Sequence, residues 1–409
     1  MKSSHIFSQA INKINFDKFA QIVAKHNGDK SAKGLKCRDI LTMMLFANFS
    51  GSDSLREICN GMAMQGGNLS HLGMSRNIGP SSLSYANAHR PWEIFRDLFD
   101  YLVKEFQPGL LKKTKRGKLK NKIFSIDSTT IDLCLSAFPW AKFHHSKGAV
   151  KIHTVLDNDS LLPVFANISH GRTHDKTVLK NVILNEFALP KNSIIAMDKA
   201  YIDYELFSEL TEKEIWFVSR IKKNAVYRVT KKYILPQNRN IISDEEIELT
   251  SLRGEKCEYF LRKIVVWDDI KKREIELLTN NQKLGATTIA NIYKSRWQVE
   301  LFFKQIKQNL KIKTFVGTSE NAVKIQIYCA LCSIVLLRHL KDVSDSIRTQ
   351  NKQKNFSFSN IVVMLRISLF RYTALDEWLS NPFLSPPEYP INLQTKADLF
   401  GQHSFRGEG

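Results

Sequence analysis

The chain has 409 residues, of which 60 are Lys or Arg and 40 are Asp or Glu, so its formal net charge is +20. Its hydrophobic share of 43% is ordinary for a folded protein, and its length suits one large domain with insertions or about two to three domains. A positive surplus of this size favours a polyanionic partner such as nucleic acid over an anionic lipid surface or a role in solubility.

The cysteines and the N-terminus argue against a secreted or membrane protein. The six cysteines are scattered, and the close pair Cys329 and Cys332 lies in an apolar run with no further metal ligand nearby. The N-terminus lacks an apolar core and a cleavage signature, and the run 327–337 is shorter than the roughly 20 residues that cross a bilayer. We therefore expect a cytoplasmic protein with no membrane partner.

Residues 1–110 are predicted to be helical, because apolar residues recur at helical spacing, for example over 16–23. Farther on, a short helix near 69–76, a turn at 78–80 and a polar helix from Ser81 give a helix-turn-helix outline. The polar helix could present side chains to base edges, which makes this region the candidate DNA-binding region. An ordinary pair of helices fits the same pattern equally well.

Residues 111–122 form a basic linker that is either a solvated loop or a track for a DNA backbone. Strands and helices then alternate over 123–221, which predicts a mixed sheet flanked by helices. The expected elements are strands at 122–127, 150–156, 162–168, 193–198 and 215–221 and helices at 174–188 and 203–212.

The second half of the chain changes character twice. Residues 222–285 are predicted to be a β-rich insertion, because β-like runs occur at 246–251, 259–267 and 274–278. Residues 286–341 return to helix, and residues 342–409 form a helical C-terminal region and tail. The expected helices span about 287–313, 320–341 and 358–379.

Two aspartates, Asp127 and Asp198, each end a predicted apolar strand. A carboxylate at the tip of a central strand projects into the crevice beside the sheet, and two such tips on one sheet can converge. Converging carboxylates repel unless they are protonated or bridged by cations, and Mg²⁺ suits such oxygen ligands. Strand-end aspartates that cap a helix or turn explain the same pattern.

The helix expected from about 287 adds a third carboxylate. Tyr293, Arg296, Glu300, Lys304 and Lys307 fall in one stripe at helical periodicity. An apolar stripe lies directly beside this row, whereas an ordinary surface helix places its charges on the opposite face. The charged row is therefore expected at the rim of a cleft, although exposed i, i+4 ion pairs have the same spacing.

These residues resemble the signature of the insertion-sequence family-four transposases, Tyr-x2-Arg-x3-Glu-x6-Lys, which Tyr293, Arg296, Glu300 and Lys307 match in full. Asp127 after an apolar strand and the segment Asp198-Lys-Ala-Tyr201 resemble the two aspartate motifs of that family, with Ala200 where Gly is common. The similarity extends over about residues 5–340.

The resemblance implies a ribonuclease H-like α/β fold and a transposase of the DDE group. It implies that Asp127, Asp198 and Glu300 are the catalytic residues and hold two Mg²⁺ ions, with Mn²⁺ as a possible substitute. The partners implied are double-stranded DNA, both element ends and target, and a second copy of the chain in a synaptic homodimer. The setting implied is a prokaryotic cytoplasm, in association with the nucleoid.

Six further residues are expected to bind DNA. The resemblance assigns phosphate contacts to Tyr293 and Arg296 and implies a tryptophan of the β-rich insertion near the cut. Trp267 is the candidate for base stacking, although a core role fits it as well, and Trp297 is expected to pack. The full DNA-binding set is Tyr201, Trp267, Tyr293, Arg296, Lys304 and Lys307.

Alternatives remain open at this point. His174-Asp175 matches the pair of a metal-dependent phosphohydrolase, and Asp132 or Asp157 could replace Asp127 as the first carboxylate. A non-enzymatic protein that binds element ends and represses, or a structure-specific nuclease of the same fold, would also fit the charge and the motifs.

Overall fold

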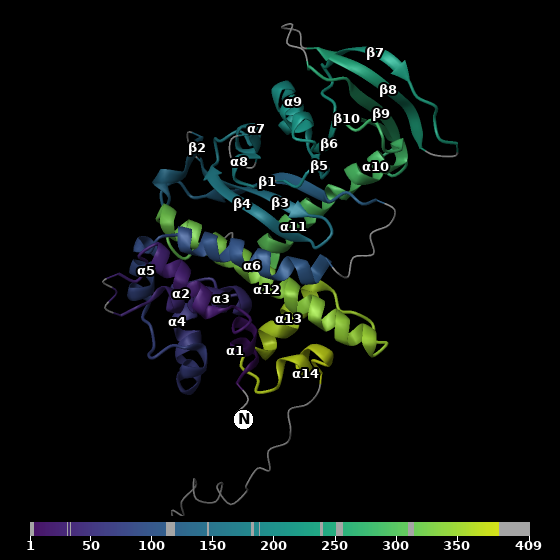
Figure 1. The fold of residues 1–409 in the computed structure, drawn as a ribbon. Helices are drawn as coiled ribbons and strands as arrows, with labels where there is room; N and C mark the ends of the chain where they lie inside the picture. The colour runs from purple at the N-terminus through teal and green to yellow at the C-terminus, as the bar shows by residue number, and fades with distance from the viewer. Residues whose placement is uncertain are drawn as a thin grey trace, which may run out of the picture.

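The computed structural model is built from a large mixed sheet and a bundle of helices (Figure 1). One long helix, α12 (Glu320–Gln350), packs on both parts. It describes residues 4–30, 32, 34–111, 119–144, 147–180, 184–187, 189–237, 240–250, 257–309 and 315–383. Most of the predicted basic linker, at 112–118, and most of the tail, at 384–409, lie outside these residues.

The sheet carries the predicted α/β core. Its strands run in the order β2-β3-β1-β5-β6-β10-β9-β8-β7, and β4 pairs with β3. β1 is parallel to β5, β5 is parallel to β6, and β3 and β4 are antiparallel additions, which is a ribonuclease H-like arrangement. The strands are β1 (Ile123–Leu133), β2 (Lys142–His144), β3 (Lys147–Asp157), β4 (Leu162–His170), β5 (Ile194–Met197), β6 (Trp216–Arg220), β7 (Val226–Lys232), β8 (Ile241–Thr250), β9 (Leu261–Asp268) and β10 (Arg273–Thr279).

The predicted β-rich insertion continues the core sheet instead of standing apart from it. β10 pairs antiparallel with β6, and β9, β8 and β7 follow in turn. The run at 226–232 is a strand that the sequence analysis did not anticipate. It lies at the sheet edge, where most of its side chains are exposed, so it carries little of the apolar alternation that reveals a half-buried strand.

Helices cover both faces of the sheet. Figure 1 shows α7, α8 and α9 above the sheet and α11 beneath it. Within the helix predicted over 174–188, the described residues contain α7 and α8, and residues 181–183 and 188 lie outside the described part. The helix predicted from about 287 divides at Arg296. The bounds are α7 (Asp175–Val178), α8 (Leu184–Glu186), η4 (Lys199–Tyr201), α9 (Tyr204–Glu212), α10 (Ala286–Ser295) and α11 (Trp297–Asn309).

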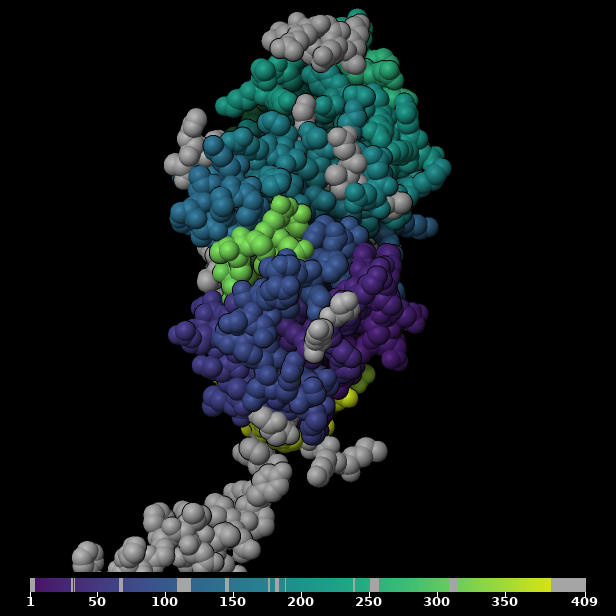
Figure 2. All heavy atoms as spheres, turned by 90° about the vertical axis from the view of Figure 1, so that its left-hand side faces the viewer, coloured from purple at the N-terminus to yellow at the C-terminus, as the bar shows by residue number. Residues whose placement is uncertain are grey.

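The remaining helices form one helical body from both ends of the chain. The helices within the predicted regions 1–110 and 342–409 pack on the same helix, α12, and the boundaries of these regions stay a prediction. Figure 2 shows the teal sheet stacked on the purple and blue helices. The bounds are α1 (Ile6–Ile11), α2 (Phe16–Lys25), α3 (Cys37–Ser50), α4 (Leu55–Ala63), η1 (Gly66–Leu72), α5 (Pro80–His89), α6 (Glu93–Leu111), α12 (Glu320–Gln350), α13 (Phe358–Ser368) and α14 (Leu375–Ser380).

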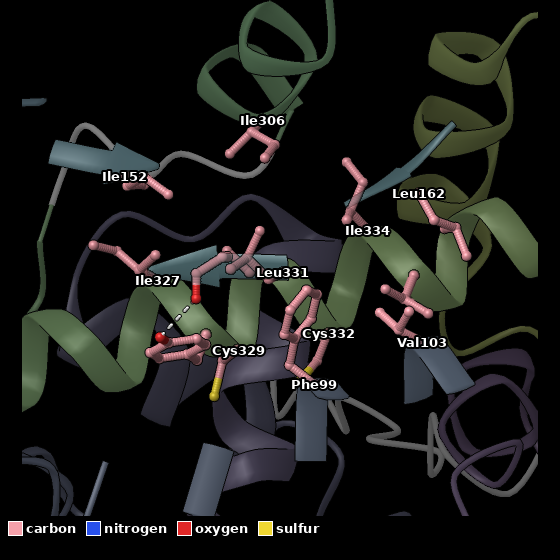
Figure 3. Close-up of a cluster of buried hydrophobic side chains, with 14 of the residues drawn as sticks. Phe99, Val103, Ile152, Leu162, Ile306, Ile327, Cys329, Leu331, Cys332 and Ile334 are labelled. Carbon is pink, nitrogen blue, oxygen red and sulfur yellow. Dashed lines mark hydrogen bonds between the residues drawn. The ribbon is translucent and has the colours of Figure 1, made fainter. Parts of the chain in front are cut away.

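The helix α12 is the centre of the hydrophobic core. It is far longer than the apolar run 327–337, and by length and hydropathy alone it could cross a membrane, but 83% of its apolar window is buried inside the protein. In Figure 3, side chains of α12 meet Phe99 of α6, Ile152 of β3 and Ile306 of α11. The sheet and the helical body therefore share one core.

The helix-turn-helix outline is only partly formed. The first segment, η1, is a 3₁₀ helix, and residues 73–79 separate it from α5, whereas a helix-turn-helix motif has a turn of about 3–4 residues. The helix α5 does exist, and it turns Ser81, Ser84 and Tyr85 to solvent while it buries Leu83.

A substitution that leaves a cavity beside α12 should lower the free energy of unfolding of the whole molecule. Leu331 is 1% exposed at the centre of this helix, so Leu331→Ala should lower the free energy of unfolding by about 2–5 kcal/mol. Urea unfolding followed by circular dichroism and by tryptophan fluorescence should show one shifted transition with both probes. Val363→Ala, at a residue of α13 that is 50% exposed, is the control and should change stability by no more than about 0.5 kcal/mol. Separate transitions for helix and sheet would contradict the shared core.

Candidate active site

The three predicted carboxylates lie near one another at the end of the sheet where the parallel strands β5 and β6 stop, and Arg296 joins Asp127 to Glu300. Ile126 pairs with Met197 and Ala196 pairs with Val218, so Asp127, Asp198 and Arg220 are level on three adjacent parallel strands. Adjacent strands lie about 4.8 Å apart, which brings the first two carboxylates close together. α11 crosses beneath β1 and supplies Glu300 to the same place.

Asp127 does not end its strand, contrary to the prediction. β1 runs on to Leu133 because β3 pairs with it along its whole length. Its parallel neighbour β5 stops at Met197, so the other edge of β1 is free of strand pairing from Asp127 onward. The crevice expected at a strand tip therefore opens beside the middle of β1.

Arg296 connects two of the carboxylates. It lies between α10 and α11, where its amide donates to the Tyr293 carbonyl in a tight turn. Its guanidinium donates to Asp127 Oδ2 at 3.2 Å and to Glu300 Oε1 at 2.5 Å, with only 13% of the side chain exposed. A half-buried guanidinium thus neutralises a pair of acids that come from distant parts of the chain.

The surroundings of Asp127 disfavour the charged form of its carboxyl group. Burial raises the pKa of Asp127 to about 6, and the negative charges of Glu300 and Asp198 add to the rise, while Arg296 and the Ser128 amide oppose it. Burial lowers the pKa of Arg296, but its hydrogen bond with Glu300 and the neighbouring charges of Glu300 and Asp127 raise it more, so the net shift of its pKa is upward. Two or three acids held together in this way need a cation.

The donor set fits a divalent cation, although the side chains do not yet form a cage. Carboxylate oxygens are the ligands that Mg²⁺ and Mn²⁺ prefer, and Asp127, Asp198 and Glu300 supply them. Among the described residues, no three His, Cys, Asp or Glu side chains lie close enough together to hold one ion in common. The contacts of Arg296 explain this, because its guanidinium stands where a cation would be shared.

The lysines of the signature have different surroundings. Lys307 donates to the Thr130 carbonyl of β1 at 3.0 Å, so it ties α11 to the strand that carries Asp127. Lys304 is exposed, as a phosphate contact requires. The predicted role of Lys307 in DNA binding is untested, and its bond to β1 shows that it also sets the position of α11.

The aromatic residues singled out in the sequence, Trp267, Trp297 and Tyr293, differ in exposure and position. Trp267 is 37% exposed, which excludes the core role; on β9, three strands from β5, it lies beyond the level of Arg220 at the same end of the sheet as the carboxylates. Trp297 was expected to pack but is 53% exposed. Tyr293 lies 5.8 Å from the Arg296 guanidinium, and burial raises its pKa.

Tyr201 does not suit the DNA contact predicted for it. Its side chain is 1% exposed, so it offers no surface to a ligand in this structure. The pKa of its buried phenol is raised well above its usual value, first by burial and then by the charges of Asp127 and Asp175. The tyrosine of the Asp198 motif therefore packs in the interior beside the carboxylates and does not face solvent.

The two alternative carboxylates, Asp132 and Asp157, do not lie where Asp127 lies. Asp132 is exposed and, five positions from Asp127 on a strand, faces the opposite side of the sheet. Asp157 is buried at the far end of β3, where it accepts from Gln107. His174 is exposed while Asp175 turns toward β1, so the two do not form the pair that a phosphohydrolase requires.

Two features escaped the sequence analysis. Arg220 ends β6 level with Asp198, and its charge acts on Tyr293. Ser128 and Asp175 form a hydrogen bond directly behind Asp127. Their positions follow from strand register and from a loop packing on the sheet, and neither leaves a local pattern in the sequence.

Comparison with known proteins shows the family of the chain. A family model described as a transposase DDE domain matches residues 118–336, and a domain of unknown function, DUF4372, matches residues 2–75. The chain belongs to the DDE transposases, the enzymes that cut and join DNA with divalent metal ions.

Its relatives are named as transposases, some of them of insertion sequences. It is 32% identical to a putative transposase of Sinorhizobium fredii over 69% of this chain and 77% of that one. It is 29% identical to a probable insertion-sequence transposase of Geobacillus stearothermophilus, over 70% of this chain and 72% of the relative. Among solved structures, a piggyBac transposase synaptic complex with hairpin DNA aligns with a TM-score of 0.40 and 12% identity, over 98% of this chain and 85% of that one.

The raised pKa of Asp127 predicts how stability depends on pH without metal. The folded protein holds the Asp127 proton more tightly than the unfolded chain, so the contribution of this group to stability is present below about pH 4 and is lost as pH rises through about 6. In EDTA, Asp127→Asn should therefore be more stable than the wild type at pH 7.5, on the order of 2 kcal/mol, and nearly equal to it at pH 4. Urea unfolding at both pH values measures the difference.

Asp132→Asn is the matched control, because it changes an exposed carboxylate of the same strand. It should leave the difference between the two pH values unchanged. A wild-type-like pH dependence in Asp127→Asn would show that this carboxyl is not strained.

Proposed function

We propose that this transposase cleaves and joins the terminal inverted repeats of its own mobile element, with Asp127, Asp198 and Glu300 as its metal ligands. The observation that carries the proposal is the gathering of these three acids at one sheet edge, where Asp127 and Glu300 already share one cation, Arg296. The positive surplus of the chain suits the DNA backbone that such a reaction must hold.

Divalent ions bound there, Mg²⁺ in our proposal with Mn²⁺ as a substitute, would activate the attacking oxygen and neutralise charge on the leaving oxygen. The chain's own residues do the positioning. Lys307 fixes α11 on β1 and so sets the separation of Glu300 from Asp127. Arg296, once it leaves the carboxylates, can contact a DNA phosphate with two donors, and Lys304 can add a point charge.

DNA recognition is proposed for surfaces on both bodies. Trp267 lies at the same end of the sheet as the carboxylates, and its exposed indole can stack on a base, while Tyr293 lies beside Arg296. On the helical body, α5 exposes Ser81, Ser84 and Tyr85, which suits contact with the element ends. We further propose a homodimer that brings two ends together in the cytoplasm, on the nucleoid.

Removal of any one metal ligand should abolish chemistry and spare binding. Asp127→Asn, Asp198→Asn and Glu300→Gln should each lower strand cleavage by on the order of 1,000-fold or more, since several kcal/mol of charge stabilisation would be lost. Labelled end DNA with Mg²⁺ measures cleavage and joining, and gel shift without metal measures binding.

Asp132→Asn serves as the control and should cleave normally. Full activity in one of the three variants would remove that residue from the site. Wild-type protein that binds ends without cutting would indicate a repressor, and nicked product without joined product would indicate a nuclease.

The contacts of Arg296 make a separate prediction. Because its guanidinium competes with metal for Asp127 and Glu300, Arg296→Gln should bind Mn²⁺ about tenfold more tightly in the absence of DNA, a change of roughly 1.4 kcal/mol. The same variant should cleave more slowly, since a phosphate contact is lost. Calorimetry measures the first effect and the end-DNA assay the second. Weaker Mn²⁺ binding in Arg296→Gln would show that the arginine assembles the site instead of occupying it.

A further inference from the structure

A polar network lies behind the strand that carries Asp127. Alternate residues of a strand face opposite sides of the sheet, so Asp127 faces α11 while Ser128 faces the side of α7 and α8. Phe124, which shares the face of Ser128, confirms this direction, because its ring meets Phe187 just after α8 at 6.1 Å. The network therefore contacts β1 from the side opposite to Arg296.

Asp175, the first residue of α7, is the centre of this network. Its Oδ1 accepts from Ser128 Oγ at 2.7 Å and from Lys151 Nζ at 3.4 Å, and it lies 3.5 Å from His153 Nδ1. Lys151 also donates to the Thr173 carbonyl at 3.1 Å, which holds the loop that leads into α7. The segment is thus attached to β1 and β3 by side chains of the same sheet face.

The network is largely shielded from solvent. The Asp175 side chain is 22% exposed, that of Lys151 16% and that of His153 1%. Burial lowers the pKa of His153 to about 4, so at neutral pH the imidazole is uncharged and the charge of Asp175 is balanced by Lys151. A shielded carboxylate with a charged donor and a hydroxyl donor holds its geometry more firmly than an exposed ion pair does.

Ser128 connects this network to the catalytic carboxylate. Its hydroxyl donates to Asp175, and its backbone amide donates to Asp127 Oδ1 at 2.8 Å. The same amide opposes the rise in the pKa of Asp127, so it favours the charged carboxylate. The segment of Asp175 also reaches the second aspartate, because α7 packs on η4, which directly follows Asp198.

We propose that Asp175 is a positioning residue for the transposase reaction, which orients the Asp127 carboxylate through Ser128 and holds the Asp198 turn beside it. The proposal rests on the proposed role of Asp127 as a metal ligand. Asp175 touches neither metal nor DNA in this role. It acts as the outer partner that keeps a ligand in its productive orientation, and loss of such a partner typically lowers metal affinity about 10–100-fold.

Ser128→Ala is the most selective test, because it removes the connection while the ion pair of Asp175 with Lys151 stays in place. It should weaken Mn²⁺ binding to the metal-free protein by about tenfold, measured by calorimetry, and raise the Mg²⁺ concentration needed for half-maximal cleavage by a similar factor. Binding of end DNA and the melting temperature without metal should stay near the wild-type values. Ser128→Thr, which keeps a hydroxyl, should restore metal binding.

Asp175→Ala should have an effect on Mn²⁺ binding at least as large, and the double variant with Ser128→Ala should be no worse than Asp175→Ala alone, because both changes break one connection. Glu205→Gln, which breaks the exposed ion pair of Lys180 with Glu205 on the neighbouring helix, is the control and should bind Mn²⁺ normally. Should Asp175→Ala fail to fold, the comparison of Ser128→Ala with Ser128→Thr decides the matter alone.

Wild-type Mn²⁺ affinity in Ser128→Ala, or equal loss in Ser128→Ala and Ser128→Thr, would overturn the proposal. Failure of the underlying site is a distinct result. If Asp127→Asn cleaves DNA normally, Asp127 is not a ligand, whereas an inactive Asp127→Asn with a normal Ser128→Ala refutes only the role of Asp175.

Discussion

Repulsion among carboxylates is the constraint on which the rest of the structure depends. Asp127 and Glu300 are brought together from a strand and a helix far apart in the chain, with Asp198 on the adjacent strand, and burial makes their charges costly. Without metal, the guanidinium of Arg296 offsets part of that cost. A divalent cation bound there would relieve the repulsion between Asp127 and Glu300, which Arg296 relieves only in part.

Holding such a site together requires a rigid frame. β1 is held by β3 along its length, by Lys307 from the side of α11 and by Asp175 through Ser128 from the other side. α11 in turn packs on the core built around α12, where side chains of sheet and helical body interdigitate. A close-packed interior resists the displacement that three like charges would otherwise favour. Stability of the helical body is therefore coupled to the geometry of the catalytic edge.

The domain of unknown function at residues 2–75 acquires a physical context from this arrangement. Its helices do not form a separate module, because α1 and α3 pack on α12 and the C-terminal helices, while α2 packs on α6 and α4 on α5. Asn48 of α3 donates to Ser333 of α12 at 3.0 Å inside that core. Any DNA contact made by this region would thus be transmitted to the sheet through packed helices and not through a flexible tether.

The sequence by itself determined the class of the fold and predicted the three acids as metal ligands. Apolar strands before Asp127 and Asp198, and a charged row beside the apolar stripe of the helix with Glu300, are local periodic patterns, and local geometry makes them readable. Only the tertiary structure decided that β1 passes beyond Asp127, that β10 joins the insertion to β6, that Tyr201 is buried, and that Arg220 and Asp175 adjoin the site. These facts depend on which strands pair, in which register, and on which loop packs behind them, and such long-range choices leave no periodic trace along the chain.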